Sequence, residues 1–195
     1  NLKIVQGAND KDIIFESDNG SGGTTAYLTL DGSATTINVS KNMHFGDGVY
    51  ANFGASSDIE IAHVNNQSYI INNVGNLEFR QNTDDGNIIF SNDNGSGGTT
   101  PYITLDGTNV RTKFHKDLNL EDGVQLQIGN SQDLKLYHSG SHSFIDQIGT
   151  GNLHITQSVD DADIVFQSDN GAGGVATYFY LDGSSATHDG SATTA

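Results

Sequence analysis

The chain repeats itself with a period of about 75 residues. The segment 17–32, SDNGSGGTTAYLTLDG, returns at 92–107 as NDNGSGGTTPYITLDG, with 13 of 16 positions identical, and again at 168–183 as SDNGAGGVATYFYLDG. In repeat arrays each unit is completed by its neighbours rather than by a core of its own. The repeat therefore predicts reach, display or assembly instead of chemistry in one pocket.

The period divides the chain into four expected parts. These are the end of a truncated repeat at 1–15, repeats at 16–90 and 91–166, and the start of a third repeat with a divergent polar end at 167–195. Because residues 1–4, NLKI, align with residues 76–79, NLEF, inside a repeat, we expect the chain to be a piece of a longer protein.

Composition limits both the core and the partners. Leu, Ile, Val and Phe together make up 47 of the 195 residues, which is enough to fold but predicts thin apolar layers. The net charge of −16 disfavours phosphate backbones and anionic lipid, so we expect neither nucleic-acid binding nor membrane insertion. The chain has no Cys and therefore no disulfide framework. No apolar stretch approaches the length of about 20 residues that a membrane span requires.

Short bursts of alternating apolar and polar residues predict β-strands, and no segment keeps a helical period. In the copy at 76–151 the expected strands lie near 77–81, 87–91, 101–105, 111–120, 124–128, 134–138 and 143–147. Asp-Gly pairs separate many of the bursts and predict tight turns with positive φ, at residues 31–32, 47–48, 85–86, 106–107, 122–123 and 182–183.

The sequence thus predicts an all-β protein, a repetitive fibrous β-structure of short strands and tight turns. A single copy would leave its apolar faces and strand edges exposed. Two arrangements solve this problem: a trimeric β-fibre, in which three identical chains share one axis, and a single-chain β-solenoid of stacked rungs. We expect the homotrimer, with the solenoid as the alternative.

One stretch of the second repeat resembles a known family. Residues 128–145, IGNSQDLKLYHSGSHSFI, followed by GTGNL at 149–153, are similar to the repeats of tail fibres of marine tailed phages. Residues 163–171, DIVFQSDNG, with Tyr178 and LDG at 181–183, resemble them too. The first copy departs from the pattern, because AHVNN at 62–66 stands where the second has YHSGS. The resemblance covers nearly the whole chain except about 184–195, where DGSATT at 189–194 restates residues 31–36.

What the resemblance implies is a fibre shaft, commonly a homotrimer, that precedes a receptor-binding tip. We therefore expect a structural segment of a phage tail fibre or comparable virion appendage, located in the virion tail or outside the cell, with itself as partner and host surface glycan as a further contact. The alternatives are an extracellular bacterial fibre or adhesin built as a β-solenoid, and a polysaccharide-cleaving tail spike. We expect no enzyme and no catalytic residues, since catalysis requires one matched set of groups outside the repeat.

Two histidines are candidate metal ligands. His63 and His138 lie 75 residues apart, on the same face of their expected strands as the neighbouring Ile and Leu residues. Around a threefold axis, three copies of one inward histidine would meet, and transition metals bind such nitrogen clusters. The alternative is a strand-end histidine that bonds to a turn.

Two further sets of residues recur. Asp18, Asp93 and Asp169 each begin an Asp-Asn-Gly triplet, which is either a calcium ligand set or a plain Asx-turn. Tyr27, Tyr102 and Tyr178 recur at one site, where they either stack on glycans or pack between neighbouring units. No cofactor is expected beyond these candidate ions.

Overall fold

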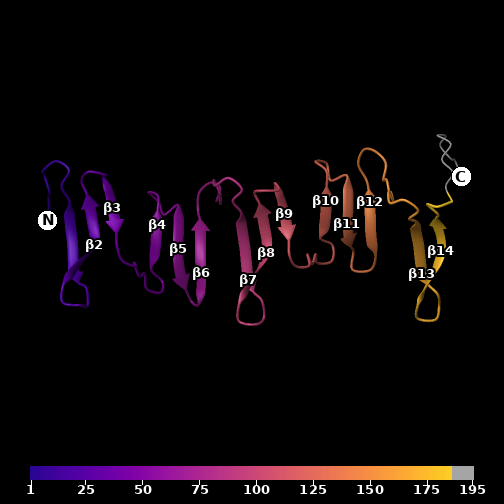
Figure 1. The fold of residues 1–195 in the computed structure, drawn as a ribbon, viewed down its shortest axis with the longest axis horizontal. Helices are drawn as coiled ribbons and strands as arrows, with labels where there is room; N and C mark the ends of the chain where they lie inside the picture. The colour runs from indigo at the N-terminus through magenta and orange to yellow at the C-terminus, as the bar shows by residue number, and fades with distance from the viewer. Residues whose placement is uncertain (186–195) are drawn as a thin grey trace. The chain divides into compact units, whose positions relative to one another are not determined.

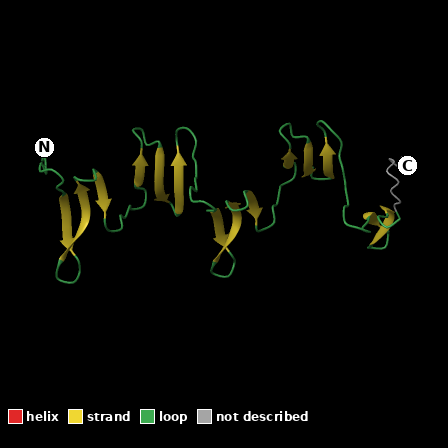
Figure 2. Ribbon diagram, turned by 45° about the horizontal axis from the view of Figure 1, so that its top comes forward, coloured by secondary structure: helices red, strands yellow, loops and turns green. Residues whose placement is uncertain are grey.

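The structure is a computed structural model that describes residues 1–185. The divergent polar end from residue 186 onward lies outside the described residues. The described part consists of fourteen strands with no helix (Figures 1 and 2). The prediction of an all-β protein is confirmed.

The strands form small antiparallel sheets of sequence neighbours. The bounds are β1 Ile13–Asp18, β2 Thr24–Asp31, β3 Thr36–Val39, β4 Tyr50–Phe53, β5 Ile59–Val64, β6 Gln67–Asn72, β7 Ile88–Asp93, β8 Thr99–Asp106, β9 Arg111–Phe114, β10 Gln125–Ile128, β11 Leu134–His138, β12 Ser143–Gln147, β13 Ile164–Asp169 and β14 Val175–Leu181. Four sheets have three strands, β1–β3, β4–β6, β7–β9 and β10–β12, and β13 pairs with β14 alone.

One period of the repeat contains two different sheets. Sheets β1–β3, β7–β9 and β13–β14 are copies of one another, and we call them the bulged sheets. Sheets β4–β6 and β10–β12 are copies of a second kind, which we call the regular sheets. The chain clusters into two compact units, Asn1–Thr83 with β1–β6 and Asp84–Ala195 with β7–β14.

Equivalent sheets have equivalent registers. In the bulged sheets the pairing shifts at the same place each time, between Phe15 and Glu16, between Phe90 and Ser91, and between Phe166 and Gln167. Such a β-bulge inserts one unpaired residue into the facing strand. Here that residue is Tyr27, Tyr102 or Tyr178, so the recurring tyrosine of the sequence is the bulged residue of β2, β8 or β14.

Two expected strands differ from the structure. Residues 77–81 alternate in strand fashion but are not a strand, and of the expected strand at 111–120 only Arg111–Phe114 forms one. Apolar and polar residues do alternate in these segments, and the apolar side chains of Leu77, Phe79, Leu118 and Leu120 are all exposed. A strand also needs a backbone partner, and among the described residues neither 77–81 nor 118–120 pairs with another strand. Alternation by itself therefore predicted more strand than the structure has.

The Asp-Gly pairs serve two different purposes. Gly48 and Gly123 have φ of 75° and 79°, which is the predicted turn geometry. At Gly32, Gly107 and Gly183 the predicted turns form, but the predicted positive φ is wrong, because none of these glycines has one. A Cβ on Gly107 would lie 2.2 Å from the carbonyl oxygen of Gly86, and at Gly32 and Gly183 the corresponding distance is 2.3 Å. Glycine is required there by close backbone approach and not by φ.

Hardly any side chain is enclosed within the single chain. Among the described residues only Ala62, Thr104 and Asp106 are buried. Within each unit the strands contact only strands of their own sheet. The sheets are therefore held by backbone pairing and turn contacts, and the described residues of each unit form no hydrophobic core of their own.

The close approach at Gly107 gives a testable consequence. Gly107→Ala should destabilise the β7–β9 sheet by about 1–3 kcal/mol, because the added methyl group overlaps a backbone carbonyl that cannot move freely. Thermal denaturation followed by circular dichroism, at one fixed protein concentration, measures the effect. Gly7→Ala is the matched control, since a Cβ there meets nothing within 4 Å. Equal melting of the two variants would contradict this account of the glycine.

Candidate functional site

Each sheet has one apolar face, which strand register assigns without ambiguity because side chains alternate between faces. In the regular sheets this apolar face carries Ala51, Phe53, Ile59, Ile61, His63, Ser68, Ile70 and, at its end, Asn72, and in the second copy Leu126, Ile128, Leu134, Leu136, His138, Ser143, Ile145 and Gln147. In the bulged sheets it carries Ile13, Phe15, Leu28, Leu30, Ile37 and Val39, then Ile88, Phe90, Ile103, Leu105, Thr112 and Phe114, then Ile164, Phe166, Phe179 and Leu181.

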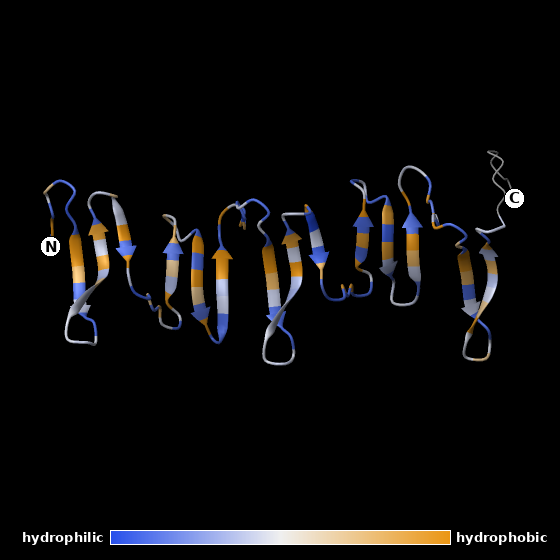
Figure 3. Cartoon of the chain, in the orientation of Figure 1, coloured by the Kyte–Doolittle hydropathy of each residue, from blue (hydrophilic) through white to orange (hydrophobic). Residues whose placement is uncertain are grey.

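The alternation is visible as bands of opposite hydropathy along the strands (Figure 3). The opposite faces are more polar and differ more between copies. Asn52, Glu60 and Gln67 in β4–β6 correspond to Gln127, Lys135 and His142 in and beside β10–β12. In the regular sheets the apolar face thus keeps its character between copies better than the opposite face does.

These apolar faces are exposed in the single chain. Ile37 is 69% exposed, and Phe53, Ile70 and Phe114 are each 55% exposed. Soluble monomers rarely expose apolar patches larger than a few hundred Å² unless the patch binds something. Within each unit, no second layer of the described residues covers these side chains.

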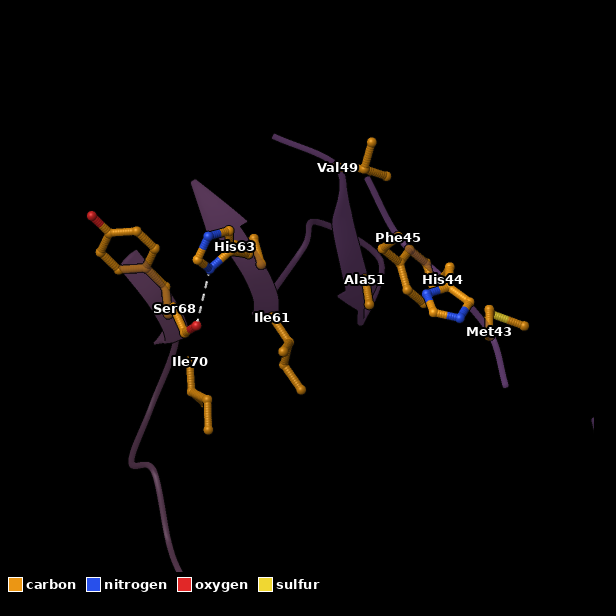
Figure 4. Close-up of a pocket in the computed structure, with 11 residues that line it drawn as sticks. Met43, His44, Phe45, Val49, Ala51, Ile61, His63, Ser68 and Ile70 are labelled. Atoms are coloured by element: carbon orange, nitrogen blue, oxygen red, sulfur yellow. Dashed lines mark hydrogen bonds between the residues drawn. The ribbon is translucent and has the colours of Figure 1, made fainter. Parts of the chain in front are cut away.

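One of these faces is hollowed into a groove. In the first regular sheet a groove of about 780 Å³ is lined by Val49, Ala51, Ile61, Ala62, His63, Ser68, Tyr69 and Ile70 together with Met43, His44 and Phe45 from the segment before β4 (Figure 4). The second copy has Leu118, Leu120, Val124 and Leu126 at the places of Met43, Phe45, Val49 and Ala51. The groove is therefore lined by a pattern that both copies share.

His63 and His138 lie at the end of this face, and each is held in the same way. The Nδ1 atom of His63 is 3.2 Å from the Ser68 hydroxyl oxygen (Figure 4), and that of His138 is 3.1 Å from the Ser143 hydroxyl oxygen. Their backbone carbonyls accept hydrogen bonds from the amides of Gly48 and Gly123, at 2.9 Å and 2.7 Å. Within residues 1–185 of one chain, no three His, Asp or Glu side chains gather closely enough to hold a metal ion.

Asp18, Asp93 and Asp169 begin three nearly identical loops. The Oδ2 atom of Asp18 accepts a hydrogen bond from the amide of Gly20 at 3.1 Å, and Asp93 and Asp169 do the same with Gly95 and Gly171 at 3.0 Å. The following asparagine accepts two further amide bonds in each loop. This is Asx-turn geometry, and calcium binding at these loops stays a prediction.

The bulged tyrosines reach back to the same loops. The hydroxyl groups of Tyr27, Tyr102 and Tyr178 donate to the backbone carbonyls of Asp18, Asp93 and Asp169, at 3.5 Å, 3.3 Å and 3.0 Å. The three tyrosine residues remain 43%, 39% and 67% exposed. In the second copy the ammonium group of Lys116 lies 6.0 Å from the Tyr102 ring centroid, a cation–π contact. The tyrosine hydroxyl groups stabilise the loops. Binding of a glycan by the exposed rings stays a prediction.

Sequence reasoning missed a third recurring aspartate, at the end of β2, β8 and β14. Hydrogen bonds from the Ala34 amide and the Ser33 hydroxyl lower the pKa of Asp31, and those from Ser184 and Ser185 lower the pKa of Asp182. At Asp106, Lys113 and then Asn109 hold the pKa far below its ordinary value. Lys113 forms a close ion pair with Asp106, and Arg111 lies 3.8 Å from the same carboxylate. The signal available in the sequence was Asp-Gly at a constant position in each copy.

Comparisons with protein-family models, with curated proteins and with solved structures found no match. The described residues contain no helix that is long and apolar enough to cross a lipid bilayer.

Asp106 gives a prediction with a definite sign. The pKa of Asp106 is lower in the folded state than in the unfolded state. Its ionised carboxylate therefore stabilises the fold above about pH 4, and this contribution is lost as the pH falls through the folded-state pKa. Lys113→Asn introduces the residue that the first copy has at this place, Asn38. It should raise the pKa of Asp106 toward the ordinary value of 3.8, as measured by carbon-detected NMR titration of the carboxyl group. An unchanged titration in the variant would show that Lys113 does not stabilise the charge. Lys135→Gln, in a different sheet, is the control.

Proposed function

We propose that the chain is a segment of a homotrimeric β-fibre, the shaft of a phage tail fibre or comparable virion appendage that spaces and presents a host-receptor-binding tip. The observation that carries this proposal is the exposed apolar face, which recurs in every sheet at one register. A face that the repeat preserves and the chain cannot cover is suited to another copy of the same chain.

The exposed apolar side chains support association. Among the described residues Ile37 is 69% exposed, and Phe53, Ile70 and Phe114 are each 55% exposed. Each sheet thus presents apolar surface that a partner would bury.

The width of the sheets favours three chains over two. Three strands about 4.8 Å apart span about 10 Å, which is also the distance at which apolar faces of two sheets pack. Two such sheets stacked face to face would leave openings as wide as the sheets themselves on both sides. A third sheet closes those openings, so three equivalent sheets around an axis cover all three apolar faces.

The two unpaired apolar segments of each repeat fit the same arrangement. Residues 77–81 and 118–120 alternate like strands and lack a backbone partner within the chain. In the trimer each would lie against the edge of a sheet in a neighbouring copy. Adding strands to open edges satisfies backbone groups and protects the edges from aggregation.

The pairing pattern disfavours the β-solenoid adhesin. Stacked rungs of a solenoid require pairing between successive units, whereas every strand pair among the described residues is antiparallel and lies within one sheet. The role we propose is mechanical, in the virion tail, with host glycan as a further contact at the exposed Tyr27, Tyr102 and Tyr178.

Adjacent residues on opposite faces of β10 test the assembly. Leu126→Asp should abolish the trimer, because it places three unpaired carboxylates in the shared interior at several kcal/mol each. Gln127→Asp should leave the trimer intact, since its side chain lies on the polar face. Both side chains are exposed in the single chain, so a monomer would tolerate both changes. Sedimentation equilibrium should give about three times 20.7 kDa for the wild type and for Gln127→Asp. A wild-type mass of one or two chains with intact β-structure would contradict the trimer.

Location in the virion needs its own test. Antibodies raised against the chain, applied to particles of a phage that encodes it, should label the tail in negative-stain electron microscopy, because a shaft segment is displayed along the fibre. Preincubation of the antibodies with the purified chain is the control. Labelling of host cell surfaces without particles would favour the adhesin instead.

A further inference from the structure

We propose that His63 and His138 each bind a first-row divalent metal ion, such as Zn²⁺, together with the same residue of two other copies of the chain. This inference rests on the proposed trimer, since each chain supplies one ligand to each site. The two sites would be repeats of one another, one in each regular sheet.

The register places both histidines on the side that the trimer would enclose. His63 pairs with Ser68 across β5 and β6 and lies on the apolar face with Ile59 and Ile61. His138 pairs with Ser143 and lies on the apolar face with Leu134 and Leu136. β5 and β11 are the central strands of their sheets. When three sheets form the sides of a triangle, the middle strand of each side is the one nearest the axis.

The rings are oriented before any assembly. The serine hydroxyl holds Nδ1 at 3.2 Å in one copy and 3.1 Å in the other. Within residues 1–185, Nε2 of neither ring has a hydrogen-bond partner. When Nδ1–H donates to the serine oxygen, Nε2 carries the lone pair that binds a metal. This is the arrangement of metal-binding histidines, whose second nitrogen is fixed by a neighbouring acceptor.

The backbone at these positions is anchored as well. The amides of Gly48 and Gly123 donate to the carbonyls of His63 and His138, at 2.9 Å and 2.7 Å. Both glycines have the positive φ of a tight turn. Each histidine is thus fixed by a turn on its backbone and a hydroxyl on its ring, and both contacts repeat.

Recurrence separates these histidines from the others. The chain has seven histidines, and only His63 and His138 are related by the period of the repeat. His44 also lines the groove of the first sheet, but the second copy has Asn119 at that place. A surface histidine without a role has no physical reason to recur at the same position with the same serine partner.

The chemistry of the site follows from three imidazoles. Three neutral nitrogen ligands bind Zn²⁺ at about 2.0–2.1 Å and leave the fourth tetrahedral position to water or another small ligand. Nitrogen ligands of this kind also accept Co²⁺ and Ni²⁺. The adjacent Ile61 and Leu136 would form apolar layers that exclude water beside the ion. A metal bound only by the assembly would stabilise the trimer over separate chains.

The test is zinc stoichiometry on the full chain. Trimeric protein is dialysed against a chelator, then against buffer with ZnCl₂ and then against metal-free buffer, and retained zinc is measured by plasma mass spectrometry. Wild type should keep two ions per three chains. His63→Asn and His138→Asn should each keep one, the double variant none, and the control His44→Asn two. Ser68→Ala should keep the trimer and weaken zinc binding at one site by about 10–100-fold.

The outcomes separate the two proposals. If sedimentation shows no trimer, the proposed function fails and this site fails with it. If wild type is trimeric but retains no stoichiometric zinc, cobalt or nickel, only the metal site is overturned. Zinc retained by the double histidine variant would overturn the assignment of these ligands.

Discussion

The apolar face of each sheet is the feature on which the rest of the structure depends. Apolar surface left in water is unfavourable, and a contiguous apolar face on a sheet is usually covered by a second layer or a partner. In this chain the sheets do not cover one another within either unit. Backbone pairing, the Asx-turns and the aspartate corners fix the shape of each sheet, but they do not supply hydrophobic burial. Within each unit the described residues do not supply that burial, and the proposed trimer would supply it.

The sequence was enough to predict a strand where alternating residues are followed, after a short turn, by a second alternating segment that pairs with them. The expected strands at 134–138 and 143–147 match β11 and β12, because the alternating residues there are joined by a short turn that forces pairing. The same alternation at 77–81 gave a wrong strand. Alternation reports which side chains share a face, whereas a strand also requires hydrogen bonds to a second segment. A single sequence does not show whether that segment exists in the same chain.

The roles of the glycines and tyrosines were harder to predict, for a different physical reason. Gly107 is needed because residue 86, far back in the sequence, approaches its backbone, and no local pattern encodes that approach. Tyr102 recurs because a bulge leaves it unpaired and its hydroxyl reaches the Asp93 carbonyl. The 75-residue repeat showed that both positions keep their residue type. Only the structure showed why: close backbone approach at Gly107, and a hydrogen bond from the tyrosine to the loop at Tyr102.

Internal repetition also separates what the fold needs from what is incidental. The apolar face keeps its character from β4–β6 to β10–β12 although Ala51 becomes Leu126 and Phe53 becomes Ile128, so volume is exchanged between positions while the face stays apolar. The polar face changes freely, from Glu60 to Lys135 and from Ala62 to Tyr137. In a monomer the apolar face would lie open to water, which gives no reason to keep it apolar. An assembly that encloses one face and exposes the other accounts for the difference between them.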